Sequence, residues 1–350
     1  MSQACDIYKI DKANHKDYQL FLDFPFDIYD DKKLMIYTRE RVISMINEAG
    51  DFDLFLAKSK NGNVLGRMVM GINHGIIDET GVPYAYIGLF DVVEDYDVFK
   101  QMIDYGKDYF SNNAYILFPF FKSTWYPYRF TSEGFDCFNY FMEYPDKKYY
   151  AEYTNKYGFE SEYKYLGSIT YDMDGLISDN KYSYQKAMKH NIQFRNFDKS
   201  RSTEDLKIIY ELTTRNYNNK TNLFYTAITF DEFNNLYRGI INMLDSEFLT
   251  IGLNEKGDPI SYCFSPPDYT PLILGTSDTI TGFIPKTVAT DKAYRKMGVV
   301  GGMLYLQSIE AKKRNYTYAI GGFTDERLFT HELMPDDLEW KKYSLYKLKI

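Results

Sequence analysis

The sequence predicts an α+β protein with two tandem domains, each an α/β/α arrangement of a mixed, mostly antiparallel sheet flanked by helices. Two observations support this fold class. The length of 350 residues suits two domains of roughly 150 to 180 residues, each able to bury its own core. The same order of predicted elements also occurs twice, with little residue identity between the copies. The predicted domains are residues 1 to 174 and 190 to 350, joined by a linker at 175 to 189.

The first copy begins with a helical segment followed by a hairpin. Residues 34 to 49 carry apolar side chains at helical spacing, and residues 52 to 72 alternate apolar and polar positions around Asn61-Gly62-Asn63. That tripeptide supplies the positive φ angle which a tight turn needs. The other elements expected in this copy are a strand at 84 to 93, a helix at 98 to 110, a buried strand at 114 to 121, a helix at 147 to 159 and a strand at 163 to 173.

The second copy repeats this order. A helix is expected to open at Ser202-Thr203-Glu204-Asp205, which combines a capping hydroxyl with acids in the first turn. Residues 266 to 282, with several Pro, Asp and Thr, are expected to form a surface loop. The remaining expected elements are a strand at 191 to 197, a helix at 229 to 244, a hairpin at 248 to 265, a strand at 283 to 290, a helix at 300 to 314, a strand at 316 to 323, a helix at 325 to 333 and a strand at 341 to 350.

Charge and cysteine content exclude several function classes. The chain has 41 Lys and Arg against 49 Asp and Glu, a net charge of −8, and no long basic block, so a nucleic-acid partner is disfavoured. Cys5, Cys137 and Cys263 show no disulfide or metal-ligand spacing, and neither do the histidines, so no metal is expected. No export signal and no run of 18 apolar residues occurs, so we expect a cytoplasmic protein without a membrane partner.

The most informative segment is "YRKMGVVGGML", residues 294 to 304, between an expected strand and an expected helix. Glycines at such a junction allow an anion to approach the free N–H groups of the helix, where the dipole is positive, and Arg295 and Lys296 add charge of the right sign. The spacing matches neither a P-loop nor a dinucleotide fingerprint. The remaining pattern is Arg-x-x-Gly-x-(Gly/Ala), with Val300 at its last place. The alternative is a turn whose glycines only permit tight helix packing.

With this motif and the element order of residues 191 to 350, the sequence resembles the GNAT superfamily of acyl-CoA-dependent N-acyltransferases. The stretches "DLFLAKSKNGNVLGRM", "YIGLFDVVEDYDVFKQMIDYGKDYF" and "KYYAEYTNKYGFESEYKYL" make it similar to a tandem bacterial form with a degenerate N-terminal copy, so two GNAT-like domains are implied. The resemblance implies acetyl-CoA or another acyl-CoA as co-substrate. It assigns the pantetheine arm to Val288, Ala289 and Thr290, and the pyrophosphate to Arg295, Lys296, Met297, Gly298, Val299, Val300, Gly301 and Gly302.

The resemblance also implies direct attack of an amine on the thioester, which requires a base, an oxyanion donor and an acid for the leaving thiolate. The family often places a Tyr seven residues beyond a polar residue at the start of the last helix. Counting from Thr324 reaches His331, which is either that acid or a surface histidine. Glu332, Asp291 and Tyr343 are weaker catalytic candidates.

The first copy serves as an internal control. Its equivalent junction reads DVVEDYDVF (91 to 99), with four acids and no glycine, so a pyrophosphate would be repelled there. We therefore expect one acyl-CoA site, in the second copy, and a small-molecule amine as acceptor. A non-catalytic acyl-CoA-binding or interaction protein stays open, and transfer of an aminoacyl group from tRNA is less favoured because the chain lacks a basic face. A homodimer is one of the assemblies left open.

Overall fold

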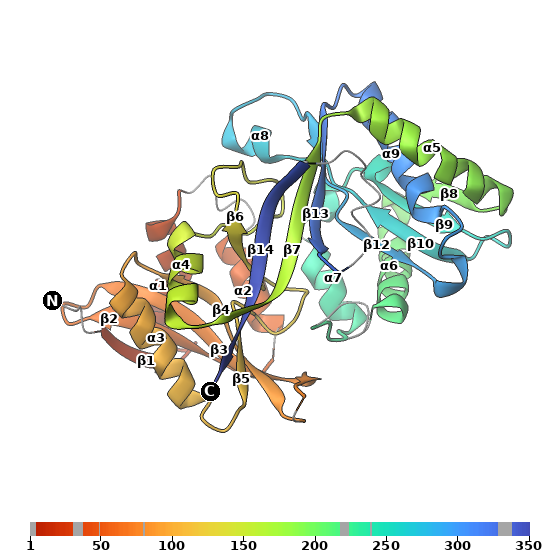
Figure 1. Ribbon diagram of the computed structural model, residues 1–350. Helices are drawn as coiled ribbons and strands as arrows, with labels where there is room; N and C mark the ends of the chain where they lie inside the picture. Colours follow the sequence, from red (N-terminus) through yellow and green to blue (C-terminus); the bar gives the residue numbers. More distant parts are fainter. Residues whose placement is uncertain are drawn as a thin grey trace. The chain divides into compact units, whose positions relative to one another are not determined.

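The computed structural model describes residues 5–30, 38–48, 50–79, 81–217, 224–238, 240–327 and 338–350 (Figure 1). The chain forms two compact units. Unit 1 comprises Met1–Lys164, Phe224–Thr226 and Lys342–Ile350, and unit 2 comprises Tyr165–Leu223 and Ala227–Lys341. Both units contain mostly antiparallel sheets flanked by helices, which confirms the predicted fold class.

The sheet of unit 1 has the strand order β1-β2-β3-β4-β5-β14, and β6 also pairs with β14. Only the β4–β5 pair is parallel among these neighbours. Its strands and helices are β1 (Cys5–Ile10), α1 (His15–Ile28), α2 (Arg39–Glu48), β2 (Phe52–Ser59), β3 (Val64–Ile77), β4 (Pro83–Val92), α3 (Tyr96–Tyr109), β5 (Tyr115–Phe118), β6 (Phe130–Glu133), α4 (Lys148–Tyr157), the first part of β7 (Glu160–Thr170) and most of β14 (Leu338–Lys349).

Helices α1 and α3 cover opposite faces of this sheet. Successive residues of a strand point to opposite faces. On β3, Gly66 lies against Met102 of α3, whereas the next residue, Arg67, donates to the main-chain oxygen of Phe21 in α1 at 2.8 Å. The core between these layers is strongly aromatic, with Phe90 and Phe118 in edge-to-face contact at 4.9 Å between ring centroids.

Unit 2 contains two sheets. The first is four-stranded and antiparallel, with the order β12-β10-β9-β8; the second pairs β13 with β7 and β11. Its further elements are α5 (Met173–Lys189), β8 (Gln193–Asn196), α6 (Ser202–Asn216), α7 (Phe230–Arg238), β9 (Leu249–Leu253), β10 (Pro259–Phe264), α8 (Thr270–Leu274), β11 (Gly282–Phe283), β12 (Thr287–Thr290), α9 (Val299–Lys313) and β13 (Tyr318–Asp325).

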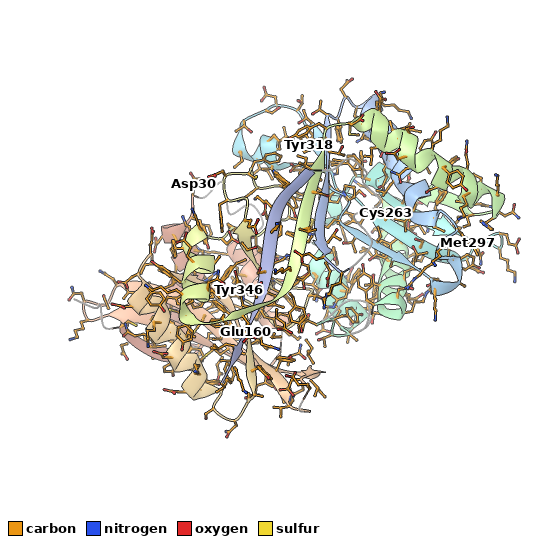
Figure 2. The ribbon with its side chains drawn as sticks, in the orientation of Figure 1. Asp30, Glu160, Cys263, Met297, Tyr318 and Tyr346 are labelled. Atoms are coloured by element: carbon orange, nitrogen blue, oxygen red, sulfur yellow. The ribbon has the colours of Figure 1, made fainter. Side chains whose placement is uncertain are left out.

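The two faces of the four-stranded sheet carry different helices. Cys263 of β10 packs with Val299 and Met303 of α9, which in turn packs along α5 (Figures 1 and 2). The neighbouring residues Tyr262 and Phe264 point to the other face and line a cavity beneath α6 and α7. The four-stranded sheet of unit 2 is therefore enclosed between α5 and α9 on one side and α6 and α7 on the other.

The structure differs from the sequence predictions at several elements. The strand predicted at 283 to 290 is two strands, β11 and β12, which belong to different sheets. Pro285 lies between them, and its missing N–H and fixed φ interrupt the ladder. The strand β1 and the helix α1 were not predicted, and the loop predicted at 266 to 282 contains α8. Residues 175 to 189, for which a linker was predicted, lie within α5.

Two further predictions meet the limits of the described residues. A helix was predicted at 325 to 333. In the structure Asp325 is the last residue of β13, and residues 328 to 333 lie outside the described part. The C-terminal strand was predicted within a domain of residues 190 to 350, whereas Lys342–Ile350 belong to unit 1. The division of the chain at 174 and 190 stays a prediction. No helix among the described residues has the length and apolar content needed to span a bilayer.

Candidate functional site

The strand β12 is the edge of its sheet, and half of its main-chain groups face away from the neighbouring strand. The N–H of Asp291 donates to the main-chain oxygen of Ile260 at 2.9 Å, and this bond identifies which residues of β12 form hydrogen bonds to β10. Bonded pairs alternate along such a ladder, so Ala289 faces β10 whereas Val288 and Thr290 face outward. The outward groups of β12 form a row that an extended ligand can use as a further strand would.

Side chains already contact this outward edge. The hydroxyl of Tyr217, at the C-terminal end of α6, donates to the main-chain oxygen of Val288 at 2.8 Å. The Nε of Arg295 donates to the oxygen of Thr290 at 3.1 Å. Tyr217 was missed by the sequence analysis, because no local pattern links it to a strand 71 residues away.

The N-terminus of α9 lies just after β12 and has free donors. Gly298 is its N-cap, with φ 80°, and no side chain caps the helix. The first bond inside the helix runs from the N–H of Gly302 to the oxygen of Gly298 at 2.8 Å, so the N–H groups of residues 298 to 301 have no partner within the helix. The N–H of Met297 contacts the oxygen of Tyr294 at 3.4 Å. Within the predicted range 295 to 302, residues 298 to 301 are therefore the best placed donors.

Three cations precede these donors along the chain. Lys292, Arg295 and Lys296 are exposed side chains within six residues of the N-cap. The helix dipole places partial positive charge at the same end, so the charges and the amides favour the same kind of ligand, an anion. Lys296 adopts φ 65°, which turns the chain sharply into the helix.

The glycines of this junction also pack against α5 and β8. A β-carbon at Gly301 would lie 2.6 Å from Cβ and 2.7 Å from Oγ of Ser183, and one at Gly302 would lie 2.8 Å from the ring of Phe194. A β-carbon at Gly298 would collide with the main-chain oxygen of Ser183. Tight packing, the alternative left open by the sequence, is therefore realised at all three glycines, against α5 at Gly298 and Gly301 and against β8 at Gly302. The first amides of α9 nevertheless have no side-chain cap.

The candidate catalytic residues fall in different places. Both carboxylate oxygens of Asp291 accept from Arg215 at 2.7 Å, and Asn216 donates to one of them at 2.7 Å, so this carboxylate is committed to the end of α6. Tyr343 belongs to unit 1, where its hydroxyl donates to Glu143 at 2.8 Å. Burial raises the pKa of Tyr343 well above its usual range. His331 and Glu332 lie outside the described residues.

The equivalent junction of unit 1 is blocked at its anion-binding end. Asp95 is the N-cap of α3, and its carboxylate accepts from the N–H of Asp97 at 2.8 Å and of Val98 at 3.3 Å. These amides therefore already bind an anion of the chain itself, which adds negative charge where a phosphate would sit.

The C-terminal part of β4 in unit 1, beyond its pairing with β5 at Ala85 and Tyr86, is closed as well. The hydroxyl of Tyr149 donates to the oxygen of Val92 at 2.7 Å, and the N–H of Val92 donates to the hydroxyl of Tyr150 at 3.3 Å. Phe90, Phe118 and Tyr150 fill the adjoining space with their rings. Both main-chain groups at the end of this strand are therefore satisfied from within unit 1.

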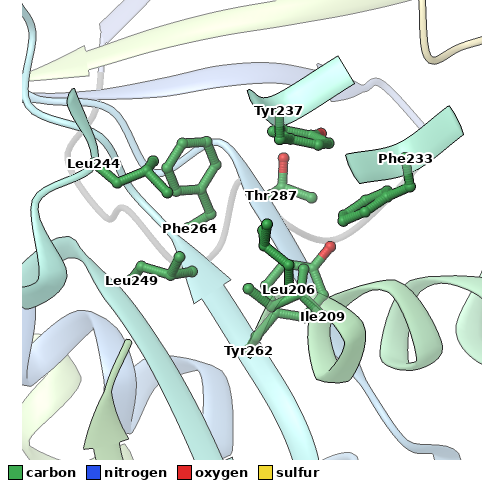
Figure 3. A pocket seen from close by; sticks show the side chains of 9 residues that line it. All are labelled: Leu206, Ile209, Phe233, Tyr237, Leu244, Leu249, Tyr262, Phe264 and Thr287. Carbon is green, nitrogen blue, oxygen red and sulfur yellow. The ribbon is translucent and has the colours of Figure 1, made fainter. Parts of the chain in front are cut away.

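A cavity lies on the α6 and α7 side of the four-stranded sheet, beside the first residue of β12 (Figure 3). The space inside it that a water-sized molecule can occupy is only about 30 Å³. Its lining side chains are mostly apolar and come from α6, α7, β9, β10, β12 and the segment before β9: Leu206, Ile209, Phe233, Tyr237, Leu244, Leu249, Tyr262, Phe264 and Thr287. No group of three or more His, Cys, Asp or Glu that could hold a metal occurs among the described residues.

The chain matches no protein-family model, and no curated protein is significantly similar to it. Among solved structures, it is similar to the GCN5-related glucosamine N-acetyltransferase region of a fungal multi-domain GH3 β-N-acetylglucosaminidase, with TM-score 0.54 and 13% identity; the match covers 99% of this chain and 38% of that protein. It is also similar to a tandem GNAT protein of the clavulanic acid biosynthesis pathway, with TM-score 0.54, 8% identity and coverage of 99% and 98%.

A third similar structure is a conserved protein of unknown function from Enterococcus faecalis V583, with TM-score 0.53, 8% identity and coverage of 98% of this chain and 72% of that one. Identities this low show the fold alone. The chain therefore has the GNAT fold in its tandem form, and the predicted resemblance is confirmed at the level of fold.

Proposed function

We propose that the chain is an N-acyltransferase that moves an acetyl or other acyl group from acyl-CoA to the amine of a small molecule, with its single acyl-CoA site in unit 2. The observation that carries the proposal is the uncapped N-terminus of α9, which follows the edge strand β12 and three exposed cations along the chain. In a tandem GNAT fold, this is where the motif at residues 295 to 302 and the thioester strand meet.

The residues of unit 2 suit the binding part of this function. The free N–H groups of residues 298 to 301 can hold a pyrophosphate, with Lys292, Arg295 and Lys296 as counter-charges. Each interaction of this kind contributes roughly 0.3 to 1 kcal/mol when exposed, and up to about 2 kcal/mol when partly buried. The outward N–H groups of Val288 and Thr290 can donate to the carbonyls of a pantetheine arm, while the oxygens of these residues accept from Tyr217 and Arg295.

Tyr217 is our candidate for the acid. A neutral amine attacks the thioester carbonyl, the C–S bond breaks, and the leaving thiolate needs a proton while the nitrogen loses one. The hydroxyl of Tyr217 lies at the outward edge of β12, where the thioester would be held, and its O–H is the donor in the bond to Val288. Asp291 instead holds Arg215 and thereby fixes the end of α6 against β12. His331 and Glu332 stay predictions for the base or a second acid.

Unit 1 is then the scaffold copy. The carboxylate of Asp95 and the hydroxyls of Tyr149 and Tyr150 take the positions that a bound coenzyme would need there. None of the three cysteines forms a disulfide bond, which is consistent with a reducing cytoplasm. The net charge of −8 is consistent with a cationic amine as acceptor.

The proposal is tested by calorimetric titration of the full chain with CoA and acetyl-CoA, followed by release of free thiol with a panel of small amines. We expect one CoA per chain and thiol release with at least one amine. Lys296→Glu should weaken CoA binding several-fold, whereas Lys313→Glu, the same charge change at the opposite end of α9, should not. Absence of CoA binding would refute the proposal. Binding without thiol release from any amine would favour the non-catalytic alternative.

A further inference from the structure

We infer that the ion pair between Arg215 and Asp291 positions the proposed acid, and that it raises the turnover rate by holding the hydroxyl of Tyr217 at the outward edge of β12. This inference rests on the proposed function, because it adds positioning residues to the same site. In this role Arg215 and Asp291 act through Tyr217 and not on the substrate itself.

The last residues of α6 are bound to the end of β12 and to the neighbouring strand. The guanidinium of Arg215 donates to both carboxylate oxygens of Asp291 at 2.7 Å, a bidentate geometry that fixes orientation as well as distance. The side-chain amide of Asn216 donates to the same carboxylate at 2.7 Å. Arg215 also donates to the main-chain oxygen of Pro259 in β10 at 2.8 Å. Two adjacent strands therefore hold the end of this helix.

The carboxylate of Asp291 is itself fixed to the sheet. Asp291 directly follows β12, and its N–H donates to the main-chain oxygen of Ile260 at 2.9 Å, so it continues the ladder with β10. On the helix side, Asn216 is 7% exposed, and its amide also donates to the main-chain oxygen of Leu212 at 2.9 Å. The place of the helix end is therefore determined relative to the edge strand.

Tyr217 comes directly after these residues and leaves the helix. Its φ of −96° and ψ of 129° are extended, so the end of α6 sets the direction in which its side chain points. The hydroxyl donates to the main-chain oxygen of Val288 at 2.8 Å. This hydrogen bond joins two neutral groups and is weaker than the charge-assisted bonds to Asp291. The ion pair, and not the phenol, therefore determines where the hydroxyl lies.

The position of this hydroxyl matters for the rate. Its proton passes to the sulfur as the C–S bond breaks, and the proton that the nitrogen loses restores the hydroxyl. A displacement of about 1 Å can lower a rate by about 10²-fold. The side chain of Arg215 is 45% exposed, and exposed ion pairs contribute little to stability. Removal of the pair should therefore slow the reaction while the chain stays folded.

The test measures turnover by thiol release, with an amine that the wild type accepts, and the dissociation constant for CoA by calorimetry. We expect Arg215→Ala to lower the turnover rate by about tenfold and to leave the dissociation constant within about twofold of the wild type. Arg215→Lys keeps the charge but cannot form the bidentate pair, so it should lose as much. Asp291→Asn provides a further variant with the same expected loss, should Arg215→Ala fail to fold.

Arg201→Ala is the matched control. The side chain of Arg201 is 47% exposed and forms ion pairs with Asp198 and Asp205 at the other end of α6, so this variant should keep the wild-type rate. A double-mutant cycle then separates positioning from a general structural role. Once Tyr217→Phe has removed the hydroxyl, Arg215→Ala should change the remaining rate by less than about twofold.

Three outcomes would overturn the inference. A wild-type rate for Arg215→Ala would show that the pair does not act on the reaction, and a wild-type rate for Arg215→Lys would show that charge alone suffices. An equal loss from Arg215→Ala with and without the hydroxyl of Tyr217 would show that Arg215 acts elsewhere. Absence of thiol release by the wild type with every amine would remove the proposed function, and the inference with it, whereas each of the three outcomes in an active enzyme removes the inference alone.

Discussion

The close approach of α9 to α5 makes Gly301→Ala an informative perturbation. In an open helix this change would stabilise the helix by about 1 kcal/mol, because Ala is the better helix former. Here the new β-carbon would lie 2.6 Å from Cβ and 2.7 Å from Oγ of Ser183, distances that real β-carbons essentially never show. Cβ of Ser183 is fixed to the main chain of α5, so one helix must move, at a cost of roughly 2 to 3 kcal/mol, from which the propensity gain of about 1 kcal/mol is subtracted.

We therefore expect Gly301→Ala to lower the free energy of unfolding by about 1 to 2 kcal/mol. For a domain of 150 to 250 residues, that is a fall in Tm of roughly 2 to 8 °C. Thermal unfolding followed by circular dichroism measures this change. The double variant with Ser183→Gly removes the clashing Cβ and should recover most of the loss, which gives a positive coupling in a double-mutant cycle. A rise in Tm with Gly301→Ala alone would refute the close packing of these helices. Because this glycine is needed for packing, its replacement is a poor test of coenzyme binding.

Three other predictions concern unit 2. Tyr217→Phe should lower the turnover rate, measured by thiol release, by about 10²-fold or more, and should leave the dissociation constant for CoA, measured by calorimetry, unchanged. An unaltered turnover rate would show that this hydroxyl has only a structural role. Burial raises the pKa of Cys263 to about 12, so in the folded protein this thiol should resist alkylation at pH 8 while Cys137 reacts, and equal labelling rates would contradict this. The free energy of unfolding should also fall as pH rises above about 9, because the thiol ionises there in the unfolded chain but not in the folded protein. Gln307→Leu should lower the free energy of unfolding, measured with urea, by about 2 to 3 kcal/mol, because the buried groups that bond to Gln307, including the hydroxyl of Ser265 at 2.7 Å, lose their partner. A decrease below about 1 kcal/mol would show that these groups find other partners.

Local sequence patterns predicted much of the fold. The hairpin around Asn61-Gly62-Asn63 and the helix after Gly298 appear in the structure because turn chemistry and apolar periodicity act over a few residues. The same holds for the helix expected to open at Ser202, where α6 begins. The sequence contains Pro285 between the segments that form β11 and β12. A proline inside an apolar run does not predict which sheet the strand on each side of it will join.

The site was predicted only in part, for a related reason. The motif at residues 295 to 302 marks a helix N-terminus, and that is a local property which the structure shows as an uncapped first turn. The contact of Tyr217 with Val288 joins distant segments, and the commitment of Asp291 to Arg215 does the same, so neither follows from spacing along the chain. The cap formed by Asp95 was readable in principle, since an Asp directly before a helix is a common N-cap.

The central claim is that the main-chain amides at the start of α9, and not those at the start of α3, bind the diphosphate of a coenzyme. Titration of CoA into protein labelled with ¹⁵N-glycine reports on these amides directly. The account predicts that the resonances of Gly298 and Gly301 shift in a saturable way, while that of Gly88 in unit 1 does not move. Saturable shifts confined to the glycines of unit 1, or no shift at Gly298 and Gly301 at saturating CoA, would contradict it.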